Sequence, residues 1–138
     1  MSATSYPATL MTGAPCKGSD GAVFSAKSGT VAAPGATDAP DISTADNGEY
    51  RCDGVSQLDV LVFANGGTCT LQHWLYSAHA GRWYLDEDWG AAGSRSFASG
   101  DRIRIPHPVS GMDAGAFAIT ANAATGVTVH VLASEVSR

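Results

Sequence analysis

Apolar and polar residues alternate along several short segments of the chain. In residues 68–77 one face carries Cys69, Leu71, His73 and Leu75, and the other carries Thr70, Gln72, Trp74 and Tyr76. A two-residue period predicts a β-strand with two distinct faces. Alternation, or a run of β-forming residues, predicts further strands at 55–64, 82–86, 101–106, 115–121 and 127–133.

Glycine-rich turns separate these segments. Asn65-Gly66-Gly67 lies between two predicted strands and predicts a tight hairpin, because Asn-Gly readily adopts positive φ angles. Residues 122–126 predict a second, closing hairpin. A central strand cannot continue through Pro106-His107-Pro108. Apart from a short stretch near 86–92, no segment has helical periodicity, so the pattern predicts an all-β antiparallel sandwich of the jelly-roll type.

The strands also predict which side chains form the core. Ile103 and Ile105 are expected to point inward, with the neighbouring Arg102 and Arg104 pointing outward. The same reasoning places Phe117 and Ile119 on one face of their strand. In the last strand it places Val127, Val129 and Val131 on one face.

Residues 1–50 have a different composition from the rest. They hold four of the six prolines and few large apolar residues. Such a segment buries too little apolar surface to offset its ordering entropy alone. We therefore expect residues 1–50 to form an extended, loop-rich N-terminal arm, with short strands near 22–26 and 29–33. Residues 51–138 are expected to form the sandwich domain.

Composition narrows the function classes. The chain has 138 residues, a net charge of −5 and 15% charged residues, so one domain is expected and a basic, nucleic-acid-binding surface is not. No apolar run is long enough to span a bilayer. The first residues lack the basic and apolar regions of a signal peptide, which predicts synthesis in the cytoplasm.

The cysteines and histidines give no recognisable motif. Cys16, Cys52 and Cys69 cannot all pair within one chain, and the absence of CxxC spacing favours free thiols over a Cys16–Cys52 disulfide. His73 and His130 lie mid-strand and could meet across a sheet, but satisfied sheet histidines are commoner than ligands. The sequence therefore predicts no metal and no cofactor.

Catalytic constellations are missing as well. The chain has no GxSxG motif, and Cys69 and His73 are about 13 Å apart along a strand, too far for a thiol–imidazole pair. Asp86-Glu87-Asp88 lies beside aromatic residues, and this suggests either a glycosidase-like acid pair, a calcium site or a solvated loop. We favour the loop because adjacent residues of a strand point to opposite faces, and we predict no enzymatic activity.

Aromatic residues are concentrated between Trp74 and Trp89. Tryptophan and tyrosine are enriched at protein interfaces, although Trp83 is expected to lie in the core. The candidate interface residues are Trp74, Tyr76 and Trp89, with the scarce large apolar residues Tyr6, Leu10 and Phe24 of the arm.

The order of these segments resembles a known class of proteins. A Pro/Ala/Gly-rich leader precedes the apolar strand LDVLVFA, the aromatic hairpin LQHWLYSAHAGRWYLDEDWG and the closing segment ITANAATGVTVHVLAS. Over residues 53–136 this resembles the small jelly-roll decoration, or cement, proteins of tailed bacteriophage capsids. The resemblance rests on the composition of these segments and on the order of the strands, and it assigns no contact residues.

The resemblance implies a structural role on the surface of the virion. Cement proteins bind the major capsid protein at junctions between capsomers, commonly as dimers or trimers, and their extended termini often reach neighbouring subunits. Two alternatives remain open: another virion component of the tail, neck or fibre, and a carbohydrate-binding sandwich that uses the tryptophans.

Overall fold

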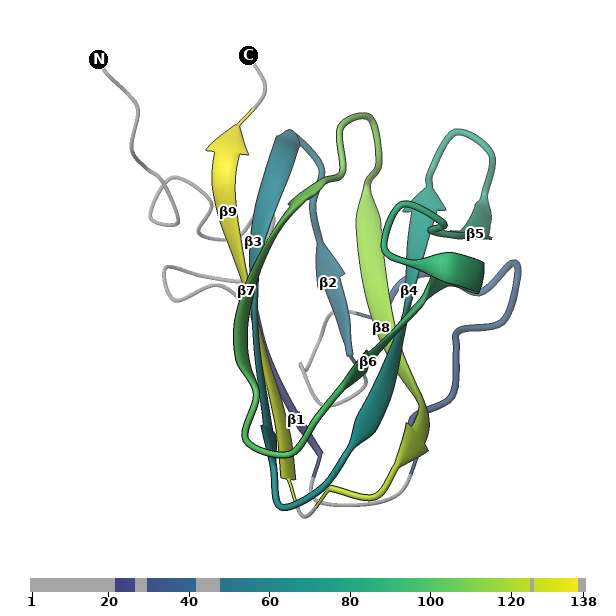
Figure 1. Ribbon diagram of the computed structural model, residues 1–138. Helices are drawn as coiled ribbons and strands as arrows, with labels where there is room; N and C mark the ends of the chain where they lie inside the picture. The colour runs from purple at the N-terminus through teal and green to yellow at the C-terminus, as the bar shows by residue number, and fades with distance from the viewer. Residues whose placement is uncertain (1–21, 27–29, 42–47, 125, 137–138) are drawn as a thin grey trace.

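The computed structural model describes residues 22–26, 30–41, 48–124 and 126–136, and two antiparallel β-sheets face each other in it (Figure 1). The four-stranded sheet has the order β1 (Ala22–Ala26), β9 (Gly126–Val136), β3 (Val55–Asn65), β7 (Arg102–Pro108). The five-stranded sheet has the order β2 (Glu49–Arg51), β8 (Ala114–Asn122), β4 (Cys69–Ser77), β5 (Arg82–Leu85), and β6 (Ser94–Phe97) also pairs with β4. The prediction of an all-β antiparallel sandwich is confirmed.

Alternating apolar residues form the core between the sheets. In β9, Val127, Val129 and Val131 are buried, as predicted, and they lie in register with the β3 strand beside them. Phe117 and Ile119 of β8 join the same core cluster from the other sheet. Each sheet therefore contributes one apolar face to a shared interior.

The turn at Asn65-Gly66-Gly67 is not a hairpin, and that prediction was wrong. The strands it joins, β3 and β4, belong to different sheets, so the chain crosses the sandwich there. The predicted closing hairpin between β8 and β9 is a second crossing of the same kind. Alternation shows only that each strand has one buried face. Two strands in opposite sheets both have such a face, and so do two strands paired in one sheet, so the pattern does not distinguish the two arrangements.

The two crossings contact each other. The amide of Ala123 donates to the carbonyl oxygen of Thr68 at 2.8 Å, and a Cβ added to Gly67 would lie 2.3 Å from the Ala123 carbonyl oxygen. Glycine is therefore required at position 67 for close approach and not for a hairpin conformation.

β4 and β5 do form a hairpin around the turn at residues 78–81, and Trp74 pairs with Leu85 in its register. After β5 the chain makes one short 3₁₀ turn, η1 (Ala91–Gly93), in place of the short helix considered near 86–92. Among the described residues, no helix has the length and apolarity needed to cross a bilayer.

Some residues before position 50 take part in the sheets. β1 pairs with β9 where a strand was predicted, and the backbone of Val31 bridges to Ile119, where a longer strand was expected. Tyr50 of β2 lies in the core with 1% of its surface exposed. The division into an arm and a sandwich domain at residue 50 stays a prediction.

β7 is an edge strand, which agrees with its two prolines. Pro106 and Pro108 pair with Asp59 and Gln57 on the inner side of this edge. Ile105 is buried as expected, whereas Ile103 is 39% exposed. Ile103 pairs with the buried Val62 and so lies on the inner side of β7, as predicted, but an edge strand is not covered along its whole length.

Candidate functional site

A cluster of polar side chains lies inside the sandwich, between the two sheets. His73 comes from the inward face of β4, His107 from the inward face of β7, and Asp86 directly follows β5. The three residues are 0%, 2% and 7% exposed, respectively. The Asp86 amide donates to the His73 carbonyl oxygen at 3.0 Å, which fixes the start of the loop beside β4.

Hydrogen bonds connect the cluster into a chain. Asp86 Oδ2 lies 2.7 Å from His73 Nδ1 and 2.5 Å from His107 Nε2, and His73 Nε2 lies 2.5 Å from the Tyr50 hydroxyl. A carboxylate can only accept hydrogen bonds, so both ring nitrogens that face it donate. A neutral His73 then accepts the Tyr50 hydroxyl proton at its other nitrogen.

The charge state of the cluster follows from its surroundings. Burial alone would raise the pKa of Asp86, but the hydrogen bonds from His107 and His73 outweigh it and hold that pKa well below its usual range. Burial lowers the pKa of His73, although Asp86 acts in the opposite direction. At neutral pH the cluster therefore holds an ionised Asp86 beside a neutral His73.

Aromatic rings enclose this cluster. The centroid of the Phe117 ring lies 4.4 Å from that of His73, and Trp89 meets His107 edge-on at 5.4 Å. Trp89 is fully buried, and its Nε1 donates to the Leu71 carbonyl oxygen at 3.1 Å. This packing buries both imidazoles, so the two histidines do not face solvent.

Sequence analysis did not predict this cluster. His73 does not meet His130, because His130 lies on the outer face of the four-stranded sheet. The three acids do not converge either, since Asp86 is buried while Glu87 and Asp88 are exposed. Two signals were present in the sequence. His73 lies two residues after Leu71 and His107 lies two residues after Ile105, so each histidine shares the inward face of its strand with an apolar residue.

The candidate interface residues have different positions. Trp74 and Tyr76 are partly buried on the outer face of the five-stranded sheet, where they pack against Trp83. Trp89 is a core residue and offers no surface to a partner. Phe24 pairs through its backbone with Val129, while Tyr6 and Leu10 lie outside the described residues.

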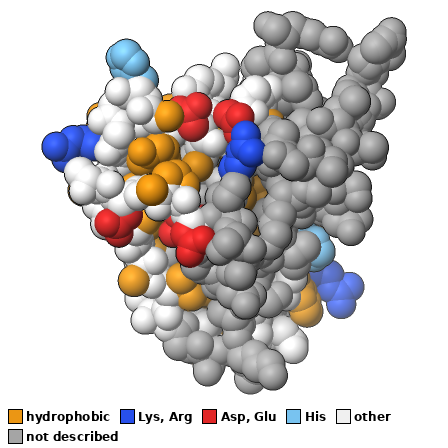
Figure 2. All heavy atoms as spheres, turned by 180° about the vertical axis from the view of Figure 1, so that it is seen from behind, with side chains coloured by type: hydrophobic (Ala, Val, Ile, Leu, Met, Phe, Trp, Pro, Cys, Tyr) orange, Lys and Arg blue, Asp and Glu red, His pale blue; other side chains and the backbone are white. Residues whose placement is uncertain are grey.

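The outer face of the five-stranded sheet is covered by the chain itself. Trp83 lies over Ala114 and Ala116, its amide donates to the Ala36 carbonyl oxygen at 3.0 Å, and its Nε1 donates to the Asp38 carbonyl oxygen at 3.0 Å. Seen from behind, a group of hydrophobic side chains still reaches the surface, with carboxylates at its border (Figure 2). Trp83 is thus buried as expected, but in a smaller cluster outside the main core.

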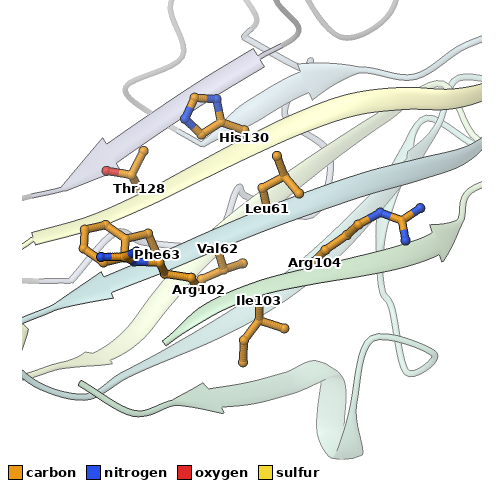
Figure 3. Close-up of a pocket in the computed structure, with 8 residues that line it drawn as sticks. All are labelled: Leu61, Val62, Phe63, Arg102, Ile103, Arg104, Thr128 and His130. Atoms are coloured by element: carbon orange, nitrogen blue, oxygen red, sulfur yellow. The ribbon is translucent and has the colours of Figure 1, made fainter. Parts of the chain in front are cut away.

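The outer face of the four-stranded sheet carries a shallow pocket of about 550 Å³ (Figure 3). Leu61 and Phe63 of β3 are half-buried there, next to Thr128 and His130 of β9. The guanidinium of Arg102 lies 5.5 Å from the centre of the Phe63 ring, and Arg104 pairs with Asp59 at 2.8 Å. We refer to this surface, formed by Leu61, Phe63, Arg102, Arg104, Thr128 and His130, as the open face.

The two described cysteines are buried. Burial raises the pKa of the Cys69 thiol, and a neighbouring Asp101 carboxylate adds to the effect. Cys16 lies outside the described residues, so its state and a pairing with Cys52 stay predictions.

Comparison with protein-family models, curated proteins and solved structures gave no match to this chain.

Proposed function

We propose that this chain is a structural protein of a tailed-phage virion, a decoration protein that binds the major capsid protein at junctions between capsomers. The resemblance of its sequence segments, in their composition and their order along the chain, to such proteins is the basis of this proposal. The all-β sandwich supports it too, because a rigid sandwich suits a protein that clamps others in place.

The open face is the observation that carries the proposal. Leu61 and Phe63 present apolar surface between two arginines, on a broad and shallow part of the sheet. Protein interfaces are enriched in aromatic residues and arginine, whereas small-molecule sites are usually deeper and more enclosed. The polar cluster of His73, Asp86 and His107 is packed inside the core and is less suited to act on a substrate.

Capsid binding tests the proposal directly. Purified protein is mixed with capsids assembled from the major capsid protein of the phage that encodes it, and the mixture is sedimented. We expect co-sedimentation at a fixed ratio to capsid subunits, and a higher temperature of DNA release from decorated heads. A chain that does not sediment with capsids and does not change their stability would contradict the proposal.

Two variants connect this result to the open face. The double variant Leu61→Ser with Phe63→Ser should lose capsid binding and keep its fold. Tyr84→Ser is the matched control, because Tyr84 is 48% exposed and does not line the open-face pocket. Equal binding by the double variant and the control would show that the open face is not the capsid contact.

Separated heads and tails provide the last comparison. A decoration protein is found by mass spectrometry on heads. Its presence on tails alone would instead assign the chain to the tail, neck or fibre of the virion.

A further inference from the structure

We propose that His73, Asp86 and His107 form a binding site for a divalent transition metal ion, with zinc as the best fit. The three residues offer His73 Nδ1, His107 Nε2 and a carboxylate oxygen of Asp86, all within 4.8 Å of one another. Two imidazoles and one carboxylate are a donor set that zinc accepts readily. The ligands come from β4, β7 and the loop after β5, so they converge only in the folded chain.

The atoms around the ligands hold them in orientation. Asp86 Oδ1 accepts the amide of Asp88 at 3.1 Å, which leaves Oδ2 directed at the two histidines. The second ring nitrogen of His73 contacts the Tyr50 hydroxyl. Histidine ligands of metals almost always have such a partner on their other nitrogen, and that partner sets the tautomer.

The contact with Tyr50 is compatible with two states of the site. Without metal, the Tyr50 hydroxyl donates to His73 Nε2, while Nδ1 donates to Asp86. With metal, the His73 proton moves to Nε2 and is donated to the Tyr50 oxygen, which frees the Nδ1 lone pair for the ion. The His107 proton moves likewise from Nε2 to Nδ1, which frees the Nε2 lone pair for the ion.

Of the three ligands, Asp86 lies nearest to solvent. Asp86 also lines a surface pocket of about 430 Å³, together with Tyr84, Glu87 and Asp88. Carboxylates at the mouth of a pocket raise the local concentration of cations. An ion from this pocket would therefore meet Asp86 first, and its passage on to His73 and His107, which are 0% and 2% exposed, requires local movement of the surrounding side chains.

A bound ion would connect the two sheets. His73 belongs to the five-stranded sheet and His107 to the four-stranded sheet. Since the ligands are brought together only in the folded state, binding stabilises that state by mass action. This inference does not depend on the proposed function, and a capsid-binding result does not affect it.

Metal titration of the full chain tests the proposal. Protein stripped with a chelator is titrated with Co²⁺, whose visible absorption reports coordination by nitrogen and oxygen ligands, and then with Zn²⁺. We expect stoichiometric Co²⁺ binding, displacement by Zn²⁺, and a rise in Tm with Zn²⁺ that the chelator reverses. No stoichiometric binding of either ion, or a Tm that Zn²⁺ leaves unchanged, would overturn the proposal.

Variants separate a metal site from a hydrogen-bonded core cluster. His107→Gln keeps an N–H that can donate to Asp86 but removes the imidazole ligand, so stoichiometric binding should be lost. Tyr50→Phe changes only the supporting contact and should weaken binding about 10-fold to 100-fold. His79→Gln is the control, because His79 is an exposed residue of the β4–β5 turn. This variant should bind the metal ion as tightly as the unaltered chain does.

The variants distinguish a metal site at these residues from binding elsewhere. If His107→Gln does not fold, Tyr50→Phe and the titration of the unaltered chain still decide the matter. Equal affinity of the unaltered chain and a folded His107→Gln variant would place the ion elsewhere and overturn the assignment.

Discussion

The two sheets have similar inner faces but different outer faces. On the five-stranded sheet, Trp83 covers Ala116, and Trp83 in turn donates its amide to the Ala36 carbonyl oxygen and its indole Nε1 to the Asp38 carbonyl oxygen. On the four-stranded sheet, Leu61 and Phe63 are partly exposed, and the Arg102 guanidinium lies over the Phe63 ring. Among the described residues, the chain thus places a tryptophan over the centre of one outer face and no comparable cover over Leu61 and Phe63 on the other. An outer face that is covered in this way contributes to stability, whereas an open one is available to a partner.

The largest loss of stability should come from removing the Trp83 side chain, which covers the outer face of the five-stranded sheet. Trp83→Ala deletes a nearly buried indole and its hydrogen bond to Asp38, so we expect the free energy of unfolding to fall by about 3–5 kcal/mol. Urea denaturation followed by circular dichroism measures this. Phe63→Ala on the open face should cost clearly less, and an equal cost for both would remove the distinction between the two faces.

A smaller effect should come from adding volume to each outer face. Ala116 is 1% exposed beneath Trp83, so Ala116→Leu should overpack the cover and destabilise the chain by about 1–3 kcal/mol. His130→Leu makes the open face larger and more apolar, and should change stability by less than about 0.5 kcal/mol. Thermal unfolding of the two variants side by side measures the contrast. A tolerated Ala116→Leu would mean that the cover is loosely packed.

The smallest effect should come from the rim of the open face. Arg102→Ala removes the guanidinium that lies 5.5 Å from the Phe63 ring centre, which should cost about 0.5–1 kcal/mol. The measurement is again urea denaturation, with Arg102→Lys as the variant that keeps the charge. A loss far above this range would show that the open face is a structural element of the monomer.

A chemical probe tests how closed the interior is. Cys69 is buried and its thiol pKa is raised, so we expect slow alkylation by iodoacetamide in the folded chain and rapid alkylation in urea. Peptide mapping distinguishes Cys69 from the other two cysteines. Rapid modification without denaturant would indicate that the sheets separate frequently near the crossing from β3 to β4.

Sequence alone predicts much of this fold, because alternation depends on local burial. The inward residues of β4 and β9 are read correctly from their period of two, and β1 is found at its observed bounds. The pairing of strands could not be read in the same way. Whether β3 pairs with β4 or faces it depends on the rest of the sheet, and the Asn65-Gly66-Gly67 turn is compatible with both.

The polar cluster shows the same limit more strongly. His73, Asp86 and His107 are separated by 13 and 21 residues along the chain, and no spacing rule connects them. Their approach results from β7 lying opposite β4 in the sandwich, which a pattern of alternation does not specify. Likewise Leu61 and Phe63 alternate as ordinary strand residues, and only the arrangement of the sheets shows that the chain leaves them partly uncovered.

The position of β9 has a consequence for how the chain folds. In the four-stranded sheet, β9 lies between β1 and β3, and β1 has no other strand beside it among the described residues. β1 is therefore synthesised long before the strand that pairs with it, because β9 begins only at residue 126 of 138. Pairings between distant parts of a chain close slowly, typically over milliseconds to seconds. During that interval the edges of β1 and β3 are unprotected, so folding should depend on chaperones or on low concentration more than the stability of the finished sandwich would suggest.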